Sequence, residues 1–262
     1  MRQGLVGQER HHRPALRGGY PSSFRRSEGR RRAWFASYVT TILQRDVRDL
    51  ADIAGLTALP QLLSLLAVRS ATLLNVSELS RSSGIPTSTL NRYLALLEHT
   101  FLVRRIPAWS SNRSKRPVRS PKLAIVDTGL MAHLAGLTSA RASREPTVVG
   151  PLLESFVTNE LQKQIGWTGG GQLFHYRTHA GREVDLVLEG GDGRVVGIEV
   201  KAAATVETRD VAGLSAFRED AGERFVRGLL LYTGTEVLPF GPGMYAMPMS
   251  ALWSDQAPSG LG

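Results

Sequence analysis

Four charged residues in the second half of the chain could together hold a divalent metal ion and activate water for attack on phosphorus: Glu154, Asp185, Glu199 and Lys201. Asp185 lies in a short apolar run, and Glu199 and Lys201 flank a valine in another. Alternate side chains of a strand point to one face, so Glu199 and Lys201 share a face and Asp185 faces away from its two apolar neighbours. Charged groups on buried strands are costly unless something compensates them.

A divalent metal ion is the compensation that we expect. Asp185 and Glu199 lie on consecutive strands joined by a glycine-rich turn at 190–193, so antiparallel pairing can bring them together. Their oxygens suit Mg²⁺ or Mn²⁺, and Glu154 can reach the same ion directly or through water. Lys201 would then orient or deprotonate a metal-bound water. The alternative interpretation is a structural ion-pair cluster without metal.

The elements that must position these residues form a small α/β sandwich over 145–253. We expect helices at 152–165 and 210–220, and strands at 173–177, 183–189, 195–201, 227–232 and 243–247. We interpret His175 as ordinary strand packing. Residues 138–149 are mostly polar and predict a linker before this domain.

A helix-turn-helix pattern precedes that domain. Asn75 or Ser77 can cap a short helix, Gly84 ends it, and Thr87 can cap a longer helix. Strands at 101–106 and 122–126 flank a basic loop, and Asp127 can cap a further helix. Together these elements predict a winged helix over 71–137 with a basic wing.

The predicted winged helix offers cationic and polar side chains to nucleic acid. Its second helix presents Ser88, Asn91 and Arg92, and its wing carries Arg113, Lys115, Arg116 and Arg119 beside Trp109. These groups suit base and phosphate contacts on DNA. The alternative is a winged helix that contacts protein.

Only two segments of the chain have a positive net charge large enough to favour an anionic partner. The 262 residues have a net charge of +9, but residues 1–32 hold nine Arg against two Glu, and 103–122 hold seven basic residues and no acidic one. Residues 123–262 have a net charge of −5. Blocks of one sign attract polyanions, although a solvated arm at 1–32 is an equal alternative.

Composition excludes several classes of protein. The absence of cysteine excludes disulfides, thiolate metal sites and cysteine nucleophiles. No run of about 18 apolar residues or secretory signal occurs, so we expect a cytoplasmic protein without a membrane partner. Residues 1–70 read as a basic arm followed by helices beginning near 32 and 57, with Tyr20, Trp34 and Phe35 in the core.

Two resemblances follow from these motifs. Asp185-x13-Glu199-x-Lys201, with Glu154 upstream, is similar to the PD-(D/E)XK nuclease signature, although residues 202–222 lack the glutamine of one branch of that superfamily. More widely, residues 15–253 resemble the C-terminal region of bacterial and archaeal AAA-type ATPases ending in domain of unknown function 4143. The carrying motifs are Trp34-Phe-x-x-Tyr38, Leu43-Gln-Arg-Asp-Val-Arg-Asp49, Ser120-Pro-Lys-Leu-x-x-x-Asp-Thr-Gly-Leu130, Leu153-Glu-x-Phe-Val157, Gly181-x-Glu-Val-Asp185 and Leu231-Tyr-Thr-Gly234.

The resemblance implies an α+β fold: a helical remnant of an ATPase lid, a winged helix and a restriction-endonuclease-like sandwich. No Gly-x4-Gly-Lys-Ser/Thr occurs, so we expect no ATP site, and the chain resembles a truncated member whose partner is a separate ATPase part or another protein. Two functions remain open. One is a magnesium-dependent, DNA-directed phosphodiesterase, and the other is a non-catalytic DNA-binding or regulatory protein with the nuclease-like fold.

Overall fold

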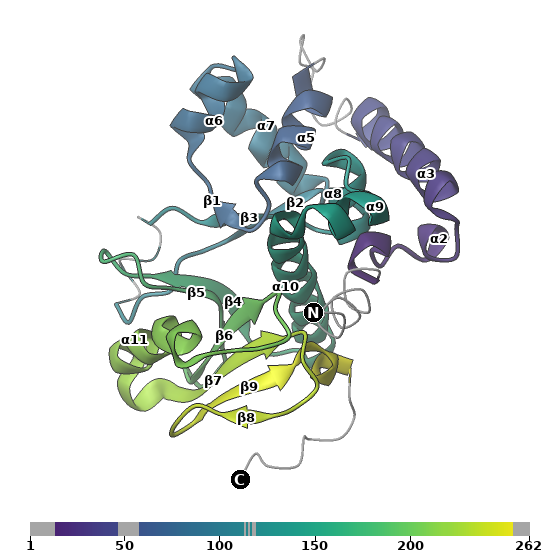
Figure 1. Ribbon diagram of the computed structural model, residues 1–262. Coiled ribbons are helices and arrows are strands. Elements are labelled where there is room, and N and C mark those ends of the chain that lie inside the picture. The colour runs from purple at the N-terminus through teal and green to yellow at the C-terminus, as the bar shows by residue number, and fades with distance from the viewer. Residues whose placement is uncertain (1–13, 47–57, 113, 115, 117–118, 254–262) are drawn as a thin grey trace. The chain divides into compact units, whose positions relative to one another are not determined.

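The computed structural model describes residues 14–46, 58–112, 114, 116 and 119–253 (Figure 1). The chain forms two compact units. Among the described residues, the helical unit comprises 14–46, 58–105 and 120–156, and the sheet unit comprises 106–112, 114, 116, 119 and 157–253. The predicted mixed α and β class is confirmed, with one sheet of three strands and one of six. Every helix in the described ranges is too short or too polar to span a bilayer.

The helical unit contains the predicted helix-turn-helix. Its elements are α2 (Pro21–Phe24), α3 (Glu28–Thr41), a π-helical turn (Ile42–Asp46), α5 (Leu59–Val68), β1 (Thr72–Leu73), α6 (Val76–Ser83), α7 (Thr87–His99), β2 (Val103–Ile106), β3 (Lys122–Ile125), α8 (Thr128–Leu134), α9 (Ser139–Arg144), a 3-10 turn (Pro146–Val148) and the start of α10 (Val149–Thr168). The three-stranded sheet of this unit has the order β1-β3-β2.

Local chemistry explains the turn between α6 and α7. The side chain of Asn75 accepts a hydrogen bond from the amide of Glu78 and caps α6, as predicted. Gly84 ends α6 with a φ of 70°, a conformation that glycine adopts without steric cost. The predicted cap at Thr87 is wrong: Pro86 occupies the N-cap of α7, with no side-chain cap bond.

A glycine-rich contact fastens the residues before α2 to the start of α8. Asp127 caps α8 by accepting from the amide of Leu130, and its other oxygen accepts from the amide of Gly19 at 2.6 Å. A Cβ on Gly18 would lie 2.2 Å from Asp127 Oδ1, and one on Gly129 would lie 2.4 Å from the carbonyl oxygen of Arg17. This packing gives the Gly-Gly and Asp-Thr-Gly sequences a structural role.

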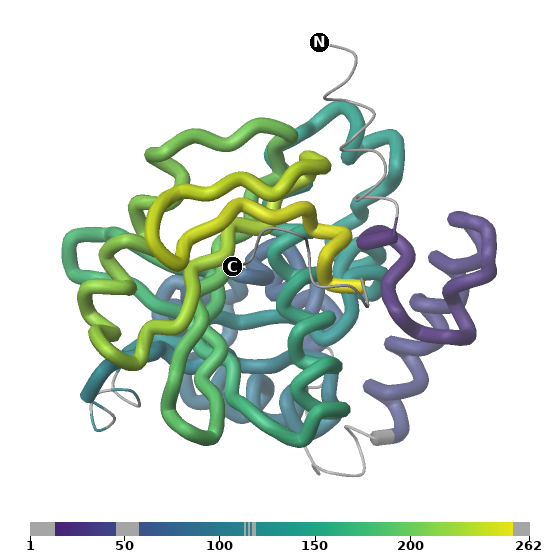
Figure 2. Tube along the Cα trace, turned by 90° about the horizontal axis from the view of Figure 1, so that it is seen from below, coloured from purple at the N-terminus to yellow at the C-terminus, as the bar shows by residue number. Residues whose placement is uncertain are grey.

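The helix α2 contacts α3 (Figure 2). Aromatic side chains of Tyr20, just before α2, and of α3 pack together at this junction. The hydroxyls of Tyr20 and Tyr38 lie 2.9 Å apart, and Trp34 stacks on Tyr38. The predicted core position is confirmed for Phe35, which is buried, whereas Tyr20 and Trp34 are half-buried. The start of the helix predicted near 57 lies outside the described residues.

The sheet unit is a six-stranded sheet of order β4-β5-β6-β7-β9-β8. Its elements are the rest of α10, β4 (Gln172–Arg177), β5 (Glu183–Glu189), β6 (Val195–Lys201), a 3-10 turn (Thr208–Val211), α11 (Ala212–Ala221), a second 3-10 turn (Gly222–Arg224), β7 (Phe225–Tyr232), β8 (Leu238–Pro239), β9 (Met244–Pro248) and a final 3-10 turn (Met249–Trp253). The strands β6, β7 and β9 are parallel, and the other pairs are antiparallel.

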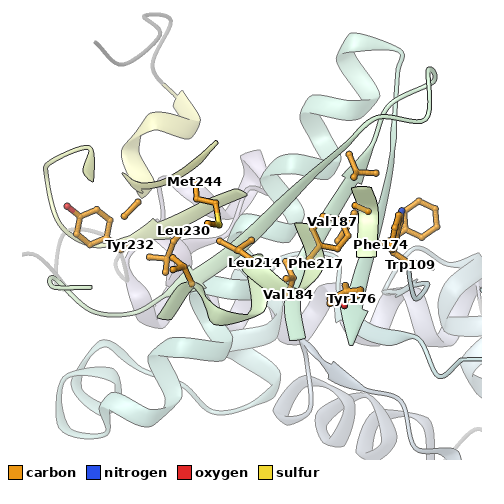
Figure 3. Close-up of a cluster of buried hydrophobic side chains, with 14 residues drawn as sticks. Trp109, Phe174, Tyr176, Val184, Val187, Leu214, Phe217, Leu230, Tyr232 and Met244 are labelled. Carbon is orange, nitrogen blue, oxygen red and sulfur yellow. The ribbon is translucent and has the colours of Figure 1, made fainter. Parts of the chain in front are cut away.

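The helix α11 covers β5, β6 and β7. Gly197 lies beneath it, because a Cβ there would approach Leu214 and Phe217 to 2.9 Å. The core of the unit gathers Leu214 and Phe217 with buried residues of the strands and with Trp109 (Figure 3).

Two predicted boundaries differ from the structure. Residues 138–149 contain α9, which Thr138 caps by accepting from the amide of Arg141, so the predicted linker is wrong. The wing segment Ile106–Arg119 belongs to the sheet unit, and the division of the chain after Phe156 falls inside α10. The segments predicted at 1–70, 71–137 and 145–253 therefore do not coincide with the two units.

Candidate functional site

Asp185 and Glu199 lie where the pairing of β5 with β6 ends. The last paired residues are Leu186 and Ile198, and the next residues outward are Asp185 and Glu199. Beyond that point Asp185 Oδ2 accepts a hydrogen bond from the amide of Val200 at 3.0 Å. A carboxylate thus takes the place of a backbone acceptor, and the hydrogen bond holds Asp185 beside the end of β6.

A bulge in β5 changes the direction of Asp185 from the one that strict alternation predicts. Phe174 pairs with Val187 and Tyr176 pairs with Val184, so two residues of β5, Asp185 and Leu186, oppose one residue of β4. Val184 and Val187 consequently join the same core, although a period of two places them on opposite faces. Bulges re-aim side chains at sites, and the sequence carries no glycine or proline here to announce one.

Lys201 forms an ion pair that the sequence analysis missed. Its Nζ lies 2.5 Å from Asp210 Oδ1 in the turn before α11. Burial acts to raise the pKa of Asp210, but the hydrogen bonds from Lys201 and from the amide of Glu207, with the charges of Lys201 and Arg209, lower it. The Glu207-x-x-Asp210 capping box is the signal that could have located Asp210.

Glu154 lies in the helical unit, where its Oε1 accepts from the buried ammonium of Lys122 at 2.6 Å. The structure brings Asp185, Glu199 and Lys201 to neighbouring ends of β5 and β6 but does not assign Glu154 to that unit. Within the described parts of the chain, no three or more His, Asp or Glu side chains gather as ligands for a metal ion.

The predicted recognition helix presents the expected face. Ser88, Asn91 and Arg92 of α7 are exposed, whereas the side chains on its other face are buried: Leu90, Tyr93, Leu94 and Leu97. The amphipathic period of α7 thus separates a polar face from the core of the unit.

The predicted wing is only partly available for contacts with phosphate. Arg113 and Lys115 lie outside the described residues. Arg119 donates to the carbonyl oxygen of Arg177, and Trp109 is fully buried. The predicted phosphate contact of Arg116 is corrected, because its guanidinium donates to both carboxylate oxygens of Glu189, at 2.6 and 3.2 Å.

That ion pair anchors the wing segment inside the sheet unit. Trp109 Nε1 donates to Glu189 at 2.8 Å, and the backbone of Pro107 and Trp109 pairs with His175 of β4. Arg116 also lies over the ring of Phe174, 4.7 Å from its centroid. His175 is buried in this arrangement, which confirms its predicted place in strand packing. The sequence predicts a phosphate contact for Arg116 because its carboxylate partner lies 73 positions away and leaves no local signal.

Comparisons with known proteins match both halves of the chain. Residues 8–141 match a family model described as Domain of unknown function (DUF8612), and residues 149–252 match Domain of unknown function (DUF4143). Two curated mycobacterial proteins, Uncharacterized protein Mb2031c of Mycobacterium bovis and Uncharacterized protein Rv2008c of Mycobacterium tuberculosis, are each 34% identical over 201 residues. Each alignment covers 76% of this chain and 45% of the relative, so the chain spans less than half the length of the relatives it matches. No solved structure matches significantly.

Proposed function

The chain belongs to the family of the Domain of unknown function (DUF8612), and from that premise we propose that it is a nucleic-acid-associated protein that binds duplex DNA through α7. The observation that carries this proposal is the exposed face of Ser88, Asn91 and Arg92 on the second helix of a helix-turn-helix. The major groove admits a helix of this kind, in which Asn pairs with adenine and Arg with guanine or phosphate.

Alanine at Arg92 is expected to weaken binding of duplex DNA about tenfold or more, because one side-chain contact to a base is worth about 1–3 kcal/mol. If Arg92 instead contacts phosphate, the variant releases about one counterion fewer on binding, so the slope of log K against log salt concentration becomes shallower by about one. Fluorescence anisotropy with a labelled duplex at several salt concentrations separates the two outcomes.

The matched control for that experiment is Arg144→Ala, which removes an exposed arginine from α9 of the same unit. If both variants bind DNA as tightly as the wild type, α7 does not read DNA. The winged helix is then a surface for protein contacts, which is the alternative that the sequence leaves open.

A second candidate function is metal-dependent cleavage of the bound DNA at Asp185, Glu199 and Lys201. Its support is the hydrogen bond from Val200 that holds Asp185 beside the position of Glu199. Magnesium keeps several waters and commonly uses one or two protein carboxylates, so these two residues fit it without Glu154. The ion would neutralise charge on the phosphate and lower the pKa of a bound water. Lys201, which is partly exposed, would orient that water or accept its proton.

Calorimetric titration with Mn²⁺ tests this candidate without any assay of cleavage. Asp185→Asn is expected to abolish saturable binding, since it removes half of the charged ligand set, whereas Lys201→Ala keeps binding and loses any cleavage. The exposed Asp192→Asn is the control and should leave binding unchanged. If the wild type shows no saturable Mn²⁺ binding with or without DNA, the carboxylates form a structural cluster, and the protein is a non-catalytic DNA-binding or regulatory protein.

The resemblance to the C-terminal region of AAA-type ATPases adds one partner to the proposal. The chain has no phosphate-binding loop of its own, so a separate ATPase part would supply any ATP hydrolysis. A sequence without that loop does not contribute the residues that hold ATP and its magnesium.

A further inference from the structure

A small cavity of about 20 Å³ lies between α3, α8 and the start of α9 in the helical unit. A single water molecule needs roughly 10–15 Å³, so the space holds one atom group of that size. The polar side chains that line it are Glu28, Arg31, Arg32, His133 and Ser139. None of them has a part in the proposed DNA or metal contacts.

Arg31 is a buried cation in this cavity. Arg31 is 8% exposed. Its Nη1 donates to the carbonyl oxygen of Arg26 at 3.1 Å, which is the one hydrogen bond that the guanidinium makes to the described residues. Burial lowers the pKa of Arg31, and the charge of Glu28 opposes that effect. A guanidinium carries five N–H donors, and a buried charge is costly unless acceptors or a counter-charge compensate it.

His133 contributes a second buried polar group. Its Nδ1 is buried and has no hydrogen-bond partner among the described residues, while its ring stacks on Phe35. Burial, and then the charge of Arg32, lowers the pKa of His133, so the ring is neutral at pH 7 and can donate one N–H. A buried donor without a partner is unfavourable, and it indicates a group that the described residues do not supply.

The charges around the cavity favour an anion. Arg31 and Arg32 face a single carboxylate, that of Glu28, and this carboxylate already accepts a hydrogen bond from Ser139. Arg17 adds a further positive charge near Arg31. An oxyanion offers several acceptor oxygens to the planar donors of arginine, whereas a water molecule leaves the excess positive charge uncompensated.

We propose that this cavity, the Arg31–His133 cavity, binds a phosphate-class oxyanion with one oxygen inside, between the Arg31 guanidinium and His133 Nδ1, and with Arg32 at the mouth. Free phosphate and the phosphoryl group of a monoester share this chemistry. Nothing in this proposal depends on binding of DNA or metal by other parts of the chain.

Calorimetric titration with sodium phosphate and, separately, with glycerol 3-phosphate tests the proposal on the full chain. The wild type is expected to show one saturable site for at least one of them, and the preferred probe distinguishes free phosphate from a monoester. Arg32→Gln, which changes an exposed side chain and should leave the fold intact, is expected to weaken binding tenfold or more. His133→Leu removes both ring nitrogens and should weaken it as well.

The control is Arg30→Gln, which removes the same charge from an exposed position of α3 that does not line the cavity. It should bind both probes like the wild type. The proposal is overturned if neither probe saturates the wild type, if sodium chloride at the same ionic strength gives the same heat, or if Arg30→Gln weakens binding as much as Arg32→Gln. Thermal unfolding of each variant without ligand verifies that the fold is retained.

Discussion

Replacing Glu189 with glutamine is expected to destabilise the sheet unit by about 3–5 kcal/mol, because it leaves the guanidinium of Arg116 buried without its counter-charge. The two side chains are 7% and 11% exposed, and Glu189 also accepts from Trp109 Nε1. Urea unfolding monitored by near-ultraviolet circular dichroism measures the change in stability. The midpoint should fall while secondary structure in the absence of urea stays unchanged.

The exposed ion pair of Arg194 with Asp192 is the comparison for that experiment, since exposed pairs contribute little. Asp192→Asn should leave the midpoint where it is. A double-mutant cycle of Glu189→Gln with Arg116→Met should recover part of the loss, because the second change removes the uncompensated charge. A Glu189→Gln variant as stable as the wild type would show that the ion pair does not anchor the wing segment.

Alanine at Gly129 is the second substitution for which we expect a large loss, about 1–3 kcal/mol in the helical unit. Its Cβ would lie 2.4 Å from the carbonyl oxygen of Arg17, and a backbone atom cannot move aside as a flexible side chain can. The hydrogen bond from the amide of Gly19 to Asp127 across the same junction must therefore lengthen or break. Differential scanning calorimetry measures the expected loss.

Gly150→Ala is the matched control and is expected to raise the stability of the protein instead of lowering it. Gly150 lies in α10 with open space around its Cα, and alanine is favoured over glycine in a helix by about 0.5–1 kcal/mol. Equal losses for both variants would mean that backbone freedom, and not the close approach at Arg17, decides the effect at Gly129.

Much of the fold could be predicted because its signals are local. Asn75 and Asp127 cap helices as expected, Gly84 turns the chain, and every strand of the sheet unit except β8 occurs at a predicted place. Each of these features depends on residues only a few positions apart, so a single sequence contains the whole cause.

The features that could not be predicted depend on residues that are distant in sequence. The sequence predicts a phosphate contact for Arg116 because its true partner, Glu189, lies far away on β5. The surroundings of Asp185 depend on a bulge that the register of β5 with β4 creates. The ion pair of Lys201 with Asp210 needed only the capping box nearby, so that residue could have been found. The candidate site was therefore predictable in composition and less so in geometry.

The insertion of the wing segment into the sheet unit has a consequence for how this protein can be divided or recombined. The path of the chain enters the sheet unit at Ile106, leaves it after Arg119 and returns at Val157. A recombination crossover anywhere from 120 to 156 would combine Trp109 and Arg116 of one parent with Glu189 of another. The strands from the second parent would then pack against an indole and an ion-pair partner that evolved with a different sheet. Substitutions in the wing segment and in β5 are therefore expected to depend on each other, although residues 120–156, which separate the two in sequence, look like a suitable place to divide the chain.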